Sequence, residues 1–81
     1  MEVKLFIKED CPRCPAARRA CDGIANLSVY DVEAIDGLAE ASSWGVLITP
    51  SVLVIDSTGR EVASWRGEAP DPSELHALLA N

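Results

Sequence analysis

Two cysteines in the segment Cys11-Pro12-Arg13-Cys14 constrain this chain more than any other feature. They directly follow an apolar run at residues 3–7 and directly precede an alanine-rich stretch that favours helix. A strand that leads into a helix through C-x-x-C places the first cysteine at the helix N-terminus, where unpaired N–H groups and the helix dipole favour negative charge. Because the thiolate is the reactive form of cysteine, this order predicts a redox-active pair. We expect Cys11 to be the exposed nucleophile and Cys14 the resolving thiol beneath it.

Length and charge limit the classes of protein to which the chain can belong. Its 81 residues, 48% of them hydrophobic, suffice for one small core, so we expect a single domain over residues 1–81. A formal charge of −6 repels phosphate backbones and anionic membranes, so neither nucleic acid nor membrane is an expected partner. The N-terminal segment lacks the features of a signal peptide, which favours a cytoplasmic protein. Three cysteines, an odd count, argue against a secreted scaffold held by disulfides.

The pattern along the chain predicts an α/β protein. Apolar or alternating runs predict four strands, at residues 3–7, 27–33, 51–55 and 60–65. Helices are expected from Cys11 to near Gly23, over residues 37–44 with Asp36 as N-cap, and after a capping box at residues 71–74. The resulting order is β-α-β-α-β-β-α, a four-stranded mixed sheet flanked by three helices. In the last helix Leu75, Leu78 and Leu79 share one face.

This order, with C-x-x-C opening the first helix and Thr49-Pro50 opening the third strand, resembles the thioredoxin fold over essentially the whole chain. Lys8, three residues before a C-P-x-C, is similar to the glutaredoxin pattern, whereas Thr49-Pro50-Ser51 and the later Gly67 look like thioredoxin. The C-P-x-C-P run resembles small glutaredoxin-like thioredoxins. The Gly-Gly and acidic residue with which many glutaredoxins hold glutathione are missing, and Trp65-Arg66-Gly67-Glu68 stands there.

The resemblance implies roles for four further residues. In this family a cis proline faces the active cysteines, so Pro50 is expected to be cis and to place Thr49 beside the Cys11 sulfur, in the path of a substrate strand. Arg13, between the cysteines, either favours the Cys11 thiolate or is a solvated charge, and Glu9 and Asp10 oppose its effect. Lys8 either holds a substrate carboxylate, such as that of glutathione, or is a surface lysine.

The remaining cysteine and histidine have simpler interpretations. Cys21 lies seven residues after Cys14, on the order of 10 Å along a helix, too far for a disulfide, so we expect a small buried side chain. A regulatory or glutathionylated thiol is the alternative for Cys21. We expect His76 to be a surface residue, and the two tryptophans, Trp44 and Trp65, to pack at the core or its rim.

The function expected from these residues is thiol–disulfide oxidoreduction by a monomer that reduces protein disulfides through a Cys11–Cys14 cycle. The cycle needs no metal or organic cofactor, and its electrons come from a separate reductase or from glutathione. Two alternatives remain open. One is a glutaredoxin that acts through Cys11 alone with glutathione, and the other is a metal-binding or redox-sensing module on the same scaffold, although only Cys21 and His76 remain as further ligands of those types.

Overall fold

The computed structural model describes residues 1–80 and has the predicted order of elements. Four strands and three helices follow one another as β1 (Glu2–Ile7), α1 (Cys14–Ala20), β2 (Leu27–Asp31), α2 (Ile35–Ser43), β3 (Ser51–Ile55), β4 (Glu61–Arg66) and α3 (Pro72–Leu79). The strands form one mixed sheet in the order β2-β1-β3-β4. β1 runs parallel to β2 and antiparallel to β3, and β4 adds an antiparallel edge. The predicted fold class is therefore confirmed.

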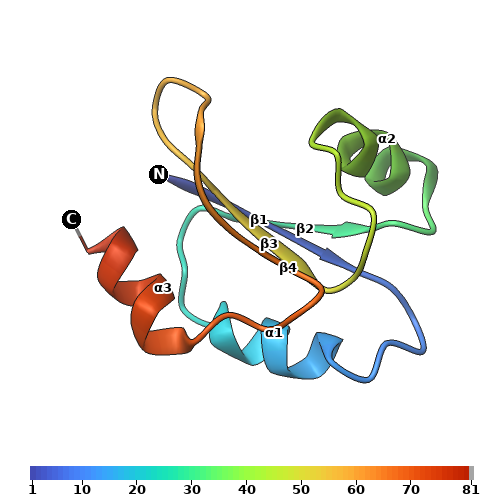
Figure 1. Ribbon diagram of the computed structural model, residues 1–81, viewed down its shortest axis with the longest axis horizontal. Coiled ribbons are helices and arrows are strands. Elements are labelled where there is room, and N and C mark those ends of the chain that lie inside the picture. The colour runs from blue at the N-terminus through green and yellow to red at the C-terminus, as the bar shows by residue number, and fades with distance from the viewer. Residues whose placement is uncertain (81) are drawn as a thin grey trace.

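The two central strands are buried on both faces and divide the core in two. Figure 1 shows α1 and α3 on one side of the sheet and α2 on the other. On the α1 and α3 side the core contains Val3, Leu5, Ala17, Cys21, Val52, Val54 and Leu75. On the α2 side it contains Phe6, Ala41, Val46, Leu53 and Ile55. Successive residues of a strand point to opposite faces, which is why odd and even positions of β1 contribute to different halves.

Helix α1 begins at Cys14 and not at Cys11, so the predicted start of this helix is wrong. The physical reason is Pro15, which has no N–H to donate to the Cys11 carbonyl. The Cys14 amide instead closes a turn on the Cys11 carbonyl at 3.3 Å, and Ala17 donates to Arg13 at 3.3 Å. Cys11 therefore lies in a turn directly before the helix.

Helix α2 also begins earlier than predicted. Its N-cap is Ala34, and Asp36 lies inside the first turn, so the prediction of Asp36 as N-cap is wrong. A Cβ at Gly37 would clash with the backbone of Asp31, and this close approach seats the first turn directly on the end of β2. The chain must coil before Asp36 to make that contact. At α3 the predicted start is confirmed, because the Asp71 carboxylate accepts from the Ser73 amide at 2.8 Å and Pro72 is the first helical residue.

Two aspartates shift the ends of the strands. The Asp31 carboxylate accepts the Glu33 amide at 2.8 Å, which turns the chain and ends β2 two residues before the predicted 27–33 boundary. The Asp56 carboxylate accepts the amides of Thr58 and Arg60, which keeps Arg60 in the turn. Strand β4 consequently covers Glu61–Arg66 in place of the predicted 60–65.

A buried lysine joins β1 to α2, a feature that the sequence analysis missed. The Lys4 side chain is 9% exposed, and its Nζ lies 2.8 Å from the Glu40 carboxylate and 3.3 Å from the Tyr30 hydroxyl. Burial alone lowers the pKa of Lys4, but the hydrogen bonds that Lys4 donates to Glu40, Tyr30 and Glu2 outweigh it, and the net pKa is raised. The same contact with Lys4 lowers the pKa of Glu40.

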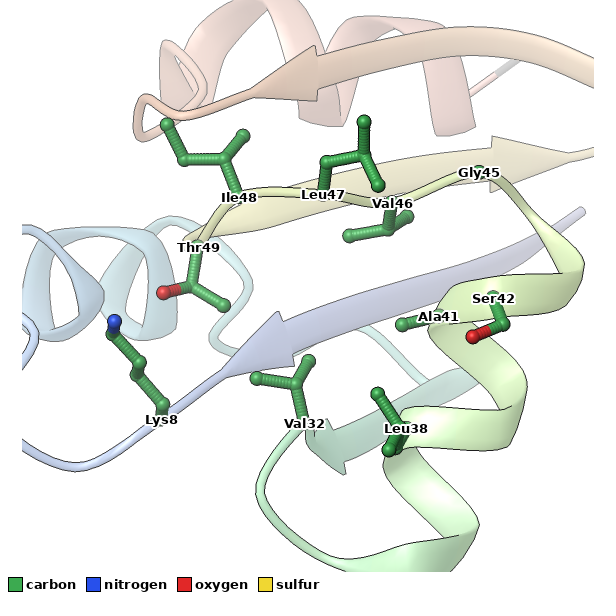
Figure 2. A pocket seen from close by; sticks show the side chains of 10 residues that line it. All are labelled: Lys8, Val32, Leu38, Ala41, Ser42, Gly45, Val46, Leu47, Ile48 and Thr49. Carbon is green, nitrogen blue, oxygen red and sulfur yellow. The ribbon is translucent and has the colours of Figure 1, made fainter.

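The parallel strands β1 and β2 end at the same edge of the sheet. Lys8 follows β1 and Val32 follows β2, and Figure 2 shows both beside the loop at residues 45–49 that leads into β3.

Candidate functional site

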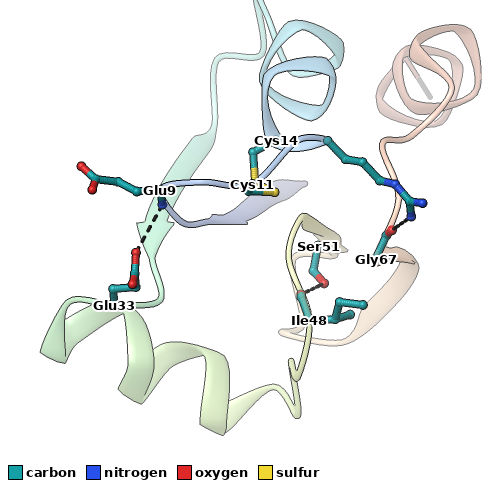
Figure 3. The surroundings of a disulfide bond; sticks show 8 residues. Glu9, Cys11, Cys14, Glu33, Ile48, Ser51 and Gly67 are labelled. Atoms are coloured by element: carbon teal, nitrogen blue, oxygen red, sulfur yellow. Dashed lines mark hydrogen bonds between the residues drawn. A yellow bond between two sulfur atoms is a disulfide. The ribbon is translucent and has the colours of Figure 1, made fainter.

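Cys11 and Cys14 are joined by a disulfide in the turn between β1 and α1, with their Cα atoms 5.4 Å apart. Figure 3 shows the bond and the residues around it. Cys14 is buried, at 5% exposure, whereas Cys11 is only partly covered. The two cysteines therefore differ in exposure in the direction that was predicted.

The loop that enters β3 contains the predicted cis bond. The peptide bond between Thr49 and Pro50 is cis, and Pro50 is buried. The Ser51 hydroxyl donates to the Ile48 carbonyl at 2.6 Å, one of the contacts drawn around the disulfide in Figure 3. The Pro50 carbonyl accepts the Gly67 amide at 2.8 Å, which ties the loop to the end of β4.

Arg13 contacts the backbone that follows β4, which the sequence analysis did not predict, and its effect on the Cys11 thiolate stays a prediction. Its Nη1 donates to the Gly67 carbonyl at 3.0 Å, so the guanidinium is engaged by the backbone after β4. Gly67 has φ +83°, and a Cβ there would approach the Ile48 side chain to 3.0 Å. One glycine thus links the turn of the two cysteines to the cis-proline loop, through Arg13 on one side and Pro50 on the other.

A groove of about 570 Å³ lies between the end of β1, α2 and the loop before Pro50. It brings together two of the predicted residues, Lys8 and Thr49, and Figure 2 shows their side chains pointing toward each other. Most of its lining was not predicted and comprises Val32, Leu38, Ala41, Ser42, Gly45, Val46, Leu47 and Ile48. The sequence contained a sign of part of this lining. The apolar run Val46-Leu47-Ile48 precedes Thr49-Pro50 and does not belong to any strand.

Other candidate residues lie away from this site. Cys21 is fully buried among the core residues under α1, and burial raises the pKa of its thiol to about 11. The His76 ring contacts the Ala20 carbonyl at 3.1 Å from an exposed position on α3. Trp44 and Trp65 are half-buried and pack on opposite halves of the core. The expected buried place of Cys21 and packing roles of the tryptophans are confirmed.

Comparison with known proteins identifies the class to which this fold and cysteine pair belong. Residues 1–80 match the family model described as a thioredoxin domain, so the chain belongs to the thioredoxin-domain family. A thioredoxin of Methanocaldococcus jannaschii is 25% identical over 59 residues, which cover 67% of this chain and 69% of that protein.

Solved structures share this fold. Thioredoxin 1 of Thermosipho africanus superposes with a TM-score of 0.73 at 19% identity, over 99% of this chain and 91% of that one. The glutaredoxin-like NrdH-redoxin of Escherichia coli is described as having a thioredoxin-like activity profile. It superposes with a TM-score of 0.62 at 25% identity, over 96% of this chain and 95% of that one. With its disulfide-forming cysteine pair, the chain is a thiol–disulfide oxidoreductase of the thioredoxin class. Within residues 1–80 no helix is both long and apolar enough to cross a membrane.

Proposed function

We propose that this protein reduces protein disulfides through a cycle of Cys11 and Cys14. The observation that carries the proposal is the disulfide itself, with a partly exposed Cys11, a buried Cys14 and a cis Pro50 in the neighbouring loop. In the reduced protein the Cys11 thiolate attacks one sulfur of a client disulfide, and the other client sulfur leaves as a thiolate that takes a proton from water.

The second step returns the protein to the oxidised state described above. The Cys14 thiolate attacks the Cys11 sulfur, breaks the mixed disulfide and releases the second client thiol. Two electrons and two protons thus pass from the cysteine pair to the client, and the Cys11–Cys14 bond forms. The Cα separation of 5.4 Å in the oxidised protein lies within the usual range for a disulfide. A monomer in a cytoplasmic setting, where thiols are kept reduced, would work in this direction.

A separate reductant must then reopen the disulfide. We propose a flavin-type reductase, since the chain lacks the Gly-Gly and acidic residue that would hold both ends of glutathione. At the corresponding place in this chain, Arg13 donates a hydrogen bond to the Gly67 carbonyl. Lys8 alone would offer one exposed ion pair, worth roughly 0–1 kcal/mol.

Glutathione-dependent chemistry through Cys11 alone is the second candidate, favoured by Lys8 and Thr49 meeting in the groove. For the metal-binding alternative no such geometry appears, because no three His, Cys, Asp or Glu side chains within residues 1–80 gather as a metal site. Metal content of the purified protein tests that alternative directly.

Insulin reduction with two donors separates the two redox candidates. We expect turnover with a flavoprotein thioredoxin reductase and NADPH, little turnover with glutathione, and loss of the reductase-driven activity in Cys14→Ser. Full turnover of Cys14→Ser with glutathione as the sole donor would establish the single-cysteine route instead.

A further inference from the structure

The two sides of the cysteine pair differ in how open they are. On the β4 side, Arg13 donates to the Gly67 carbonyl at 3.0 Å and the Gly67 amide donates to Pro50 at 2.8 Å. These bonds occupy the backbone groups of Gly67 and connect the cysteine turn to the cis-proline loop. An incoming chain on that side would have to displace them. The α2 side contains the groove, and the hydrogen bond from the Glu9 amide to the Glu33 carboxylate on that side does not involve the cis-proline loop.

Exposed apolar side chains gather on this open side. Among the seven large apolar residues that are exposed within residues 1–80, four belong to α2 and the loop that follows it, namely Ile35, Leu38, Leu47 and Ile48. Leu47 is 96% exposed, and Figure 2 shows it projecting from the loop. Apolar side chains clustered around a groove mark an interaction surface, whereas single exposed ones do not.

The entrance between the groove and Cys11 is acidic. Glu9 follows the lining residue Lys8, Glu33 follows the lining residue Val32, and Asp10 directly precedes Cys11. The Glu9 amide donates to the Glu33 carboxylate at 3.3 Å, so the two segments are tied together beside the disulfide (Figure 3). All three carboxylates belong to exposed residues, and two exposed cations, Lys8 in the groove wall and Arg13 between the cysteines, belong to the same part of the chain.

We infer that client chains enter from the α2 side, with an aliphatic residue in the groove and lysine or arginine at the acidic entrance. This inference rests on the proposed function and adds the class of client. Charges arranged in this way raise the rate of encounter with a cationic partner and lower it for an anionic one. An apolar and basic protein segment fits the surface, and the anionic tripeptide glutathione does not.

Single-turnover rates of the reduced protein with three peptides test the inference. The peptides have equal length, and each contains one cysteine that is joined to 2-mercaptoethanol by a disulfide. In the first peptide leucine and arginine flank this cysteine, in the second leucine and glutamate, and in the third serine and arginine. At low ionic strength we expect the first to react about tenfold faster than the second, with a gap that shrinks as salt rises. The peptide that lacks leucine should be slower than the first by about threefold at any salt concentration.

Variants locate the effect. Glu33→Lys should reduce the preference for arginine over glutamate, and Leu47→Ser should reduce the preference for leucine over serine. Asp22→Lys and Val62→Ser, at exposed positions outside the groove, are the matched controls and should change neither ratio. Equal rates for all three peptides, with the neutral hydroxyethyl disulfide also reduced, would overturn the inference and leave the proposed function intact. No reaction with any disulfide would overturn both.

Discussion

Cys11 and Cys14 face different surroundings although only two residues lie between them. Cys14 is 5% exposed at the start of α1, and Cys11 lies in the preceding turn with part of its surface open. In thiol–disulfide exchange the attacking sulfur must reach its partner, so access divides the two roles. The proposed role of Cys11 as nucleophile therefore rests on exposure, because the helix begins only at Cys14.

Alkylation rates test this division. In a Cys21→Ala background, the protein that keeps only Cys11 (Cys14→Ser) should react with iodoacetamide about tenfold faster near neutral pH than the protein that keeps only Cys14 (Cys11→Ser). Quenched samples analysed by mass spectrometry give both rates. Equal rates, or faster labelling of Cys14, would reverse the assignment.

Cys21 should behave as a core residue, and the titration of its thiol should affect the stability of the protein. Because burial raises the pKa of its thiol from 9.0 to about 11, the folded state holds the proton more tightly than the unfolded state does. This contribution to stability is complete below pH 9 and is lost as the pH rises toward 11.

Chemical denaturation at pH 8 and pH 10.5 measures this contribution. Between these values wild type should lose about 2 kcal/mol more unfolding free energy than Cys21→Ala does. The oxidised wild-type protein should also resist iodoacetamide at pH 8. Rapid labelling of Cys21 in the folded protein would favour the alternative of a regulatory thiol.

At the scale of elements, α2 is held on the sheet by an ion pair as well as by apolar contacts. Lys4 is 9% and Glu40 29% exposed, so the lysine charge is almost fully removed from water and depends on its partner. Loss of one member of such a pair leaves the other unpaired, whereas replacement of the lysine by an apolar residue of similar size removes that requirement. Because α2 also forms a wall of the groove, this ion pair helps to hold that wall in position.

We therefore expect unequal effects from the two halves of this pair. Glu40→Ala should lower the free energy of unfolding by about 2 kcal/mol, and Lys4→Met by less than about 1 kcal/mol. Since Lys4 lowers the pKa of Glu40, the contribution of this ion pair to the free energy of unfolding is present above pH 4.5 and declines as the pH falls below it.

Urea denaturation at pH 7 and pH 4 checks both the unequal effects of the two variants and this pH dependence. The matched control Asp36→Ala, an exposed acid on α2, should cost about 0.5 kcal/mol; a similar small value for Glu40→Ala would contradict the interpretation.

At the scale of the whole molecule, the order of elements could be predicted because it depends on local patterns. The β-branched run before Asp56, the capping box at Asp71 and the alanine-rich stretch after Cys14 each specify one element. Boundaries were predicted less well, since they depend on single interactions such as the missing N–H of Pro15 and the carboxylates of Asp31 and Asp56. Those effects are visible only when the hydrogen-bond partners are known.

The site divides in a similar way. The cysteine pair and the Thr49–Pro50 bond follow from motifs, so they could be recognised in the sequence. The link from Arg13 to Gly67 joins residues 54 positions apart, and the link from Lys4 to Glu40 joins residues 36 positions apart. Charge and spacing along the chain contain no information about which of these partners meet. The apolar lining of the groove could therefore be identified only once the three-dimensional structure was known.

Covalent trapping of a client is the most direct measurement of the central claim, that Cys11 attacks a protein disulfide and Cys14 resolves the intermediate. Reduced Cys14→Ser, in the Cys21→Ala background, is mixed with an oxidised protein substrate and analysed by mass spectrometry without reductant. We predict a stable mixed disulfide mapped to Cys11, none with Cys11→Ser, and only free reduced client with both cysteines present. A mixed disulfide mapped to Cys14, or no trapped species while the protein with both cysteines still reduces the client, would contradict the claim.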